Sequence, residues 1–156
     1  MAESIRLSIS NIAWDKADDE AVYTEMQAHG FAGLELAPTR IFPQQPYDQL
    51  SSAILFGGYL KNRWGFSVPS IQSIWYGQTG SIFHPDEAEA LLDYTAGACQ
   101  FAHSLNCPSM VFGCPKNRTL APGDDPAAGD RFFVQAGNLA ARYGVVLAIE
   151  ANPPVY

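Results

Sequence analysis

Short hydrophobic runs alternate strictly with longer segments of helical periodicity along this chain. The hydrophobic runs predict five β-strands, at residues 5–10, 31–37, 66–74, 109–114 and 145–151. The intervening segments predict four helices, at about residues 18–29, 47–64, 85–105 and 126–143. Such alternation favours parallel strands joined by right-handed helical crossovers, because a tight hairpin cannot join parallel neighbours. The sequence therefore predicts an α/β protein.

The predicted helix ends carry residues that start and stop helices. Pro85 and Pro126 suit the first turn, where the backbone N–H has no partner within the helix, and Asp125 suits the N-cap before Pro126. Glycine is favoured in the left-handed position just after a helix, and three helices are followed by one: Gly30, Gly65 and Gly144.

The faces of the predicted strands distinguish an open doubly wound sheet from a (β/α)8 barrel. In the last strand, Val145, Leu147 and Ile149 share one face, whereas the opposite face carries Glu150. The first two predicted strands alternate in the same way. An open sheet covered by helices on both sides should be apolar on both faces, and no phosphate-binding glycine motif follows the first strand. We therefore expect an incomplete TIM (β/α)8 barrel of about five parallel strands and four helices.

Composition limits the classes of partner. With 47% hydrophobic residues, the chain can bury one sizeable core, and we expect a single domain over residues 1–156. A net charge of −7 gives no electrostatic footprint for nucleic acid or an anionic membrane. The apolar runs are shorter than a bilayer span, the first residues do not resemble a signal peptide, and three scattered cysteines indicate reduced thiols. These features predict a cytoplasmic protein.

Glu150 is the leading candidate for a catalytic residue, because it follows the last hydrophobic strand on the face expected to line the barrel interior. TIM-barrel active sites form at the C-terminal ends of the strands. A carboxylate there can bind a hard divalent cation or transfer a proton beside a carbonyl. The alternative is a structural ion pair with Lys116 or Arg118.

A cationic segment, CPKNR, follows the strand predicted at residues 109–114. Its cations, Lys116 and Arg118, suit a phosphate or a polyhydroxylated anionic substrate, although a solvated loop that balances acidic neighbours would look the same. We interpret Cys114 as a small buried residue.

Four other candidates for substrate binding follow predicted strands: Trp14, Gln72, His84 and Asn152. A role at a helix end is the simpler account of His84, and Trp14 could equally well pack in the core. Glu35 lies in the middle of a predicted strand, where a buried pair with Arg6 or another cation is the favoured interpretation.

Five segments, in chain order, carry a resemblance to a known family: SNIAWD, GLELAPTRIFP, PSIQSIWYGQ, MVFGCPKNR and AIEANPPVY. Together they resemble the sugar phosphate isomerase/epimerase family, which has the xylose isomerase-like TIM barrel. Among its more distant relatives is the endonuclease IV type of DNA-repair enzyme. The resemblance covers the whole chain but only the N-terminal part of such a barrel.

This resemblance implies a divalent metal at the C-terminal mouth of the barrel, Mn2+ or Mg2+ first and Zn2+ or Co2+ as alternatives. The usual ligands are a Glu on the fifth strand and an Asp, a His and a second Glu on later strands. Glu150 matches the first of these, and the other three would follow Tyr156. We therefore expect this chain to be a truncated half-site.

The activity that the resemblance implies is isomerisation or epimerisation of a sugar or sugar phosphate. A glutamate would remove the proton beside the carbonyl to give an enediolate, and the site of reprotonation would decide the product. A non-catalytic alternative is a half-barrel that associates with a second copy or with a complementary half through its unpaired strand edges. An endonuclease is less favoured, because it would need a basic DNA-facing surface.

Overall fold

The long helices lie where the sequence predicts them. The computed structural model of the protein describes residues 6–151. Its four long helices are α1 (Asp19–Ala28), α3 (Leu50–Tyr59), α4 (Pro85–Ser104) and α5 (Pro126–Arg142). Asp125 caps α5 as expected, since its carboxylate accepts a hydrogen bond of 3.0 Å from the Ala127 N–H. The three predicted helix-ending glycines have φ of +74° (Gly30), +77° (Gly65) and +69° (Gly144).

The helix predicted at residues 47–64 is divided. A 3-10 turn, η2 (Pro46–Asp48), ends at Gln49, whose φ of −102° and ψ of +43° are not helical, and α3 begins one residue later. A π-helical turn, η3 (Leu60–Trp64), follows α3.

Besides the long helices and η3, the described residues form four helical elements of about one turn each. One is α2 (Pro38–Ile41), which the sequence did not predict, and two are the 3-10 turns η1 (Lys16–Asp18) and η4 (Pro115–Arg118). The fourth is η2. Three of them begin at or next to a proline, whose fixed φ suits a first helical turn.

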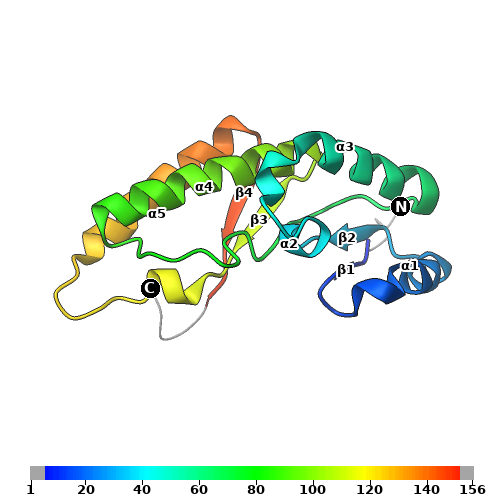
Figure 1. Cartoon of the computed structure of the whole chain (residues 1–156), viewed down its shortest axis with the longest axis horizontal. Helices are drawn as coiled ribbons and strands as arrows, with labels where there is room; N and C mark the ends of the chain where they lie inside the picture. Colours follow the sequence, from blue (N-terminus) through cyan, green and yellow to red (C-terminus); the bar gives the residue numbers. More distant parts are fainter. Residues whose placement is uncertain (1–5, 152–156) are drawn as a thin grey trace, which may run out of the picture.

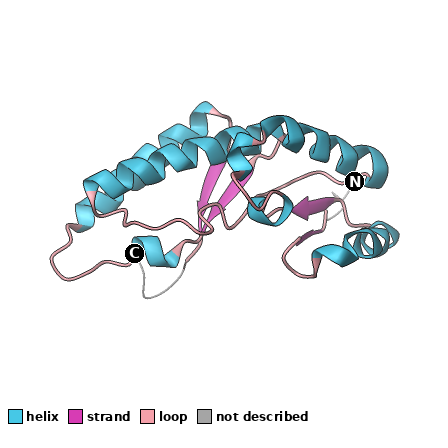
Figure 2. Cartoon of the chain, viewed as in Figure 1, coloured by secondary structure: helices cyan, strands magenta, loops and turns pink. Residues whose placement is uncertain are grey.

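The strands form two short parallel pairs, coloured magenta in Figure 2. In the first pair β1 (Ser8–Ser10) lies beside β2 (Gly33–Glu35), with Ser8 opposite Gly33. In the second pair β3 (Ser109–Phe112) lies beside β4 (Val146–Ile149), with Ser109 opposite Val146. The parallel arrangement confirms the predicted α/β class.

The prediction of a regular strand at residues 66–74 is wrong. This segment is extended chain with isolated bridges to β2 and β3, and it connects the two pairs: Leu34 donates its N–H to the carbonyl of Ser67 at 2.9 Å, and Val111 donates to the carbonyl of Ile71 at 2.8 Å. Pro69 interrupts the segment, because proline has no N–H to give to a ladder. The parallel order is nevertheless β1, β2, this segment, β3 and β4.

Three helices, α3, α4 and α5, lie along one side of the strands, whereas α1 lies beside β1 and β2 (Figure 1). The core forms where these helices meet the central strands. Leu34, Leu36, Ile71 and Met110 are fully buried there. An aromatic cluster joins Trp75 to Phe112 and Phe132 at centroid distances of 4.5 and 5.5 Å. No helix within residues 6–151 is long and apolar enough to cross a membrane.

The outer strands depart from the predicted burial pattern. In β2 Leu34 is buried, and Glu35 is half-buried. The partner of Glu35 is the Ser70 hydroxyl, which donates a hydrogen bond of 2.5 Å to it, instead of the predicted Arg6 or another cation. By contrast, Ile9 in β1, Leu7 just before it and Ile149 in β4 are exposed. These strands lie at the two ends of the described strand order, and within residues 6–151 no further strand pairs with their outer edges.

Candidate functional site

A hollow of about 300 Å³ lies at the C-terminal ends of the extended segment, β3 and β4. Its lining consists of seven residues: Gln72, Ser73, Val111, Gly113, Cys114, Pro115 and Glu150. The ends of parallel strands are where the active sites of TIM barrels form. Two predicted site residues, Gln72 and Glu150, meet here, and we call this hollow the candidate site.

Glu150 reaches the candidate site because the β3–β4 ladder continues one residue beyond β4. The Glu150 N–H donates to the carbonyl of Phe112 at 3.0 Å, which holds its backbone beside the end of β3. The residue is exposed. Its carboxylate is therefore accessible to a ligand in the hollow.

Arg118 lies beneath this site and is 2% exposed. Its Nε donates to the carbonyl of Gly113 at 2.6 Å, a terminal guanidinium nitrogen donates to the carbonyl of Glu150, and the guanidinium carbon lies 5.9 Å from the centre of the Phe112 ring. The guanidinium thus joins the ends of β3 and β4 and is not part of the hollow's lining. Lys116 is exposed on η4 and also lies outside that lining.

The polar side chains of the candidate site are oriented by hydrogen bonds. The Ser73 hydroxyl donates to Oε1 of Gln72 at 2.6 Å, and Nε2 of Gln72 donates to the Ser10 hydroxyl oxygen at 3.1 Å. This chain connects the hollow with the end of β1. The sequence places Ser73 at the same strand end as Gln72, but only Gln72 was predicted as a substrate contact.

Two residues of the hollow have strained backbones. Ser73 has φ of +54° and Cys114 has φ of +40°, in the left-handed region that non-glycine residues rarely adopt. Within residues 6–151 there are two other such residues, Gln45 and Asn106. Each such conformation costs on the order of 1 kcal/mol, and residues of this kind concentrate at functional sites. This strain supports the choice of site.

The Cys114 thiol is neutral at physiological pH. Burial raises its pKa to about 11, an effect that outweighs the hydrogen bond from Trp75 and the nearby Arg118 cation, both of which lower it. A thiol of this kind is a poor nucleophile and a poor metal ligand, because both roles need the thiolate. Cys114 is half-buried and lines the hollow, so it is less buried than the sequence predicted.

His84 lies away from the candidate site, at the start of α4. Its Nδ1 is 3.1 Å from Oε2 of Glu87, and its Nε2 is 3.3 Å from Oδ1 of Asp124. Hydrogen bonding to Glu87 and then to Asp124 raises the pKa of this exposed imidazole. His84 therefore connects α4 with the loop that precedes α5.

Trp14 also lies elsewhere, beside the ends of β1 and β2. Its indole N–H donates to Oδ1 of Asp19 at 2.8 Å, and the Arg40 guanidinium lies 5.5 Å from its ring centre while pairing with Asp19 at 2.7 Å. The structure thus places Trp14 in a packed ionic cluster. Asn152 lies outside the described residues.

The described residues do not by themselves fit a divalent metal. Within residues 6–151, no group of three or more His, Cys, Asp or Glu side chains is placed to hold an ion. The candidate site offers one carboxylate, Glu150, beside a protonated thiol.

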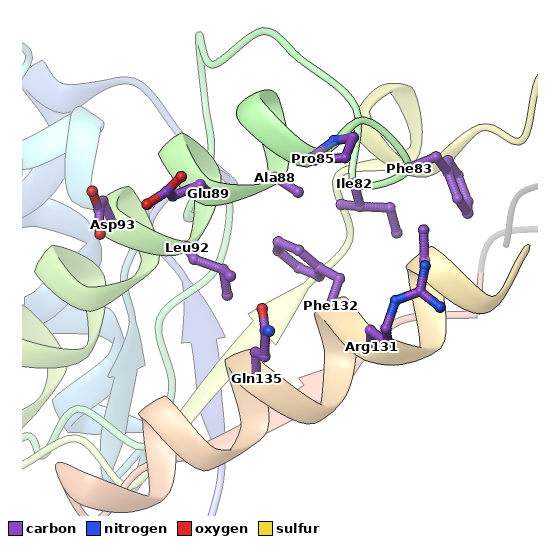
Figure 3. Close-up of a pocket in the computed structure, with 11 residues that line it drawn as sticks. Ile82, Phe83, Pro85, Ala88, Glu89, Leu92, Asp93, Arg131, Phe132 and Gln135 are labelled. Atoms are coloured by element: carbon purple, nitrogen blue, oxygen red, sulfur yellow. The ribbon is translucent and has the colours of Figure 1, made fainter. Parts of the chain in front are cut away.

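A larger hollow, of about 500 Å³, lies between α4 and α5 (Figure 3). Glu89 and Asp93 line it from α4, and Arg131 and Gln135 line it from α5, with Phe132 between them. This groove lies between the outer helices, and none of the predicted site residues lines it. Its position separates it from the strand ends.

No family model and no curated protein matches this chain. Solved structures do match it. A 3-keto-D-glucoside 4-epimerase from E. coli is 16% identical with a TM-score of 0.65, over 97% of this chain and 58% of that protein. The IOLI protein, solved with a zinc atom, is 12% identical with a TM-score of 0.66, over 93% of this chain and 51% of that one. A sugar phosphate isomerase/epimerase from Parabacteroides distasonis is 8% identical with a TM-score of 0.63, over 96% of this chain and 52% of that protein.

These matches show a likeness of fold. The chain spans about half the length of the solved structures it matches. The predicted resemblance to sugar phosphate isomerase/epimerase and xylose isomerase-like proteins is confirmed at this level: the chain has an α/β fold with short parallel strand pairs that is similar to part of these proteins.

Proposed function

We propose that this chain provides the N-terminal half-site of a sugar isomerase or epimerase, in which Glu150 exchanges a proton with the carbon beside a sugar carbonyl. The observation that carries the proposal is the position of Glu150, exposed in a hollow at the strand ends beside the polar side chains of Gln72 and Ser73. The likeness of fold to a sugar epimerase supports it.

The chemistry follows from these side chains. The Glu150 carboxylate accepts the proton of the carbon next to the carbonyl, which leaves an enediolate, and then returns it. Return to the neighbouring carbon, with the hydroxyl proton moving to the former carbonyl oxygen, isomerises the sugar. Epimerisation instead needs a second acid on the opposite face to protonate the same carbon, while Glu150 keeps the proton that it removed. The Gln72 amide and the Ser73 hydroxyl bind sugar hydroxyl groups, since their hydrogen-bond chain to Ser10 holds them in place.

Metal dependence is part of the proposal, with Glu150 as one carboxylate ligand of Mn2+ or Mg2+. One structure of similar fold was solved with zinc, so Zn2+ remains an alternative, as does Co2+. Because residues 6–151 hold no group of three ligands, the other ligands would come from outside them. We accordingly propose residues 1–156 as part of one barrel domain whose remainder lies elsewhere.

Lys116 and Arg118 have different proposed roles. We propose that Arg118 positions Glu150 through its backbone carbonyl, instead of contacting the substrate as the sequence suggested. Lys116, exposed on η4, remains a proposed substrate contact. His84, Trp14 and Asn152 stay predictions, and the contacts of His84 and Trp14 with Asp124 and Asp19 favour structural roles.

Deuterium exchange tests this proposal. The protein, or a longer protein that contains it, would be incubated in D2O with Mn2+ and a panel of ketohexoses, aldohexoses and their phosphates. Deuterium entering the carbon beside the carbonyl would be measured by NMR. Glu150→Gln should lower the incorporation at least about 100-fold, because a general base is removed. The control is Glu89→Gln, which removes an exposed carboxylate on α4 outside the candidate site and should leave the incorporation unchanged.

Incorporation at an equal rate in Glu150→Gln would contradict the role of Glu150. No incorporation by any form would favour the non-catalytic alternative, a half-barrel that associates through its open edges. A specific observation favours that alternative: Ile9 on β1 with the adjacent Leu7, and Val146 and Ile149 on β4, are all exposed. Large apolar groups left open at strand edges promote association.

A further inference from the structure

The outer side of α3 differs from that of the other long helices. Its sequence, LSSAILFGGY, contains no charged residue, whereas α1, α4 and α5 each carry charged residues. Leu55 at its centre is 75% exposed, and Ile54 and Tyr59 are exposed as well. A surface helix usually presents charged or polar residues to water, so an apolar outer side indicates an interface. Figure 1 shows α3 at one end of the helical layer.

The spacing along this helix defines a surface that we call the α3 face: Ser51, Ser52, Leu55, Gly58 and Tyr59. Each of the other four residues is three or four positions from Leu55, so they surround it on one side of the helix. Small residues flank Leu55 on both sides, and a Cβ added to Gly58 would meet nothing within 4 Å. A second helix can therefore approach the backbone closely on either side of Leu55.

A crevice of about 490 Å³ adjoins the α3 face. Ile54, Gly57, Gly58 and Lys61 belong to its lining. The same helix thus carries a projecting side chain, Leu55, and next to it a space that can receive one. Self-association about a two-fold axis needs this combination, because the same surface must provide both partners of every contact.

The charges at the two ends of the α3 face are complementary under a two-fold rotation. Asp48, seven residues before Leu55, and Lys61 and Arg63, six and eight residues after it, are exposed. Asp48 lies in η2, before the start of α3, and Lys61 and Arg63 lie in η3, after its end, so an antiparallel pair centred on Leu55 brings opposite charges together at each end. Asp48 of one copy then meets Lys61 and Arg63 of the other, and the reverse contact forms at the opposite end.

We propose that two copies of this chain pair through their α3 faces, antiparallel, about a two-fold axis near Leu55. The apolar centre excludes water while the paired charges at the rim fix the direction. We choose a second copy as the partner. Two copies with a net charge of −7 each would repel through most surfaces, but α3 carries no carboxylate, so the α3 faces can meet without that repulsion.

The test is the molar mass in solution, measured by sedimentation over a range of concentrations. We expect a dimer for the unmodified chain. Leu55→Asp should weaken dimerisation on the order of 30-fold or more, because the substitution puts two facing carboxylates at the centre of the interface. The matched control is Val134→Asp on α5, where the side chain is 63% exposed, and it should leave the dimer unchanged. Asp48→Lys should also weaken the dimer, and adding Lys61→Asp and Arg63→Asp should restore it.

Association through the open strand edges gives a different pattern. If Ile149→Asp on β4 abolishes the dimer while Leu55→Asp keeps it, the proposal is overturned. A monomer at every concentration overturns it too. Leu55→Cys provides a second test that does not depend on a buried charge: air oxidation should yield a covalent dimer, whereas Val134→Cys should remain largely uncoupled. Circular dichroism verifies that each variant is folded.

Discussion

Arg118 shows what a single buried side chain decides in this protein. The sequence predicted a substrate contact, because two cations follow a strand in CPKNR. In the structure Cys114 adopts a left-handed conformation just before η4, and the Arg118 guanidinium donates to the carbonyls at the ends of β3 and β4. The residue pattern cannot separate these outcomes, since exposed and buried arginines can follow a strand in the same way.

Removing the Arg118 guanidinium should destabilise the protein. Arg118→Met keeps most of the side-chain volume but leaves the carbonyls of Gly113 and Glu150 without this donor. We expect a loss on the order of 2–4 kcal/mol in the free energy of unfolding, because two hydrogen bonds from a charged group are lost. Urea unfolding measures it. Lys116→Met, two residues away and exposed, should stay within about 0.5 kcal/mol of the unmodified chain.

His84 should make stability depend on pH. Its pKa is raised in the folded protein by Glu87 and Asp124, so the folded state favours the imidazolium. Both ring nitrogens face carboxylate oxygens, and only the protonated ring can donate to both. The stabilisation is therefore complete below the unfolded pKa of about 6.5 and is lost as pH rises through the higher folded value.

The measurement compares the unmodified chain with His84→Gln by urea unfolding at two pH values, about 5.5 and about 9. The stability difference between the two proteins should be larger at the lower pH. Asp124→Asn removes one carboxylate partner and should reduce this pH dependence. An equal difference at both pH values would contradict the assignment of these contacts.

At the scale of elements, the extended segment between β2 and β3 shows the limit of pattern reading. Its hydrophobic alternation resembles a strand, and its backbone does bond to both neighbours. Pro69 prevents a continuous ladder and packs against β2. A proline interrupts a strand only where its position should donate an N–H to a neighbouring strand. The sequence of the segment alone does not show where that neighbour lies.

The contact between β2 and this segment is tight enough to test. A Cβ on Gly33 would lie 3.0 Å from Cδ of Pro69 and 3.3 Å from the carbonyl oxygen of Ser67. Gly33→Ala should therefore destabilise the protein by about 1–3 kcal/mol through overpacking. The control is Gly137→Ala in α5, where a new Cβ meets nothing within 4 Å. That change should stabilise by about 0.5–1 kcal/mol, because alanine is the better helix former. Thermal unfolding of both variants would measure the contrast.

For the whole molecule, the central question is what covers its open surfaces. The described strand order ends in β1 and β4, whose outward aliphatic side chains are exposed. The α3 face is a separate apolar surface on the helical side of the molecule. Dimerisation through the α3 face and association through the strand edges bury different residues. Leu55→Asp and Ile149→Asp therefore distinguish these two modes of association.

The sequence by itself determined the α/β class, the parallel order and most helix boundaries, because these follow from local signals: hydrophobic period, prolines in first turns, the Asp125 cap and glycines after helices. It also placed Gln72 and Glu150 at strand ends, where the structure brings them together.

Only the tertiary structure decided which polar residues line that hollow and which support it. The tertiary structure directs the Arg118 guanidinium to backbone carbonyls, brings His84 to two carboxylates and packs Trp14 against Arg40. It also left α3 with an apolar side facing outward. The physical reason is that desolvation and hydrogen-bond partners depend on residues far apart in the chain, whereas helix and strand signals are read within a few residues.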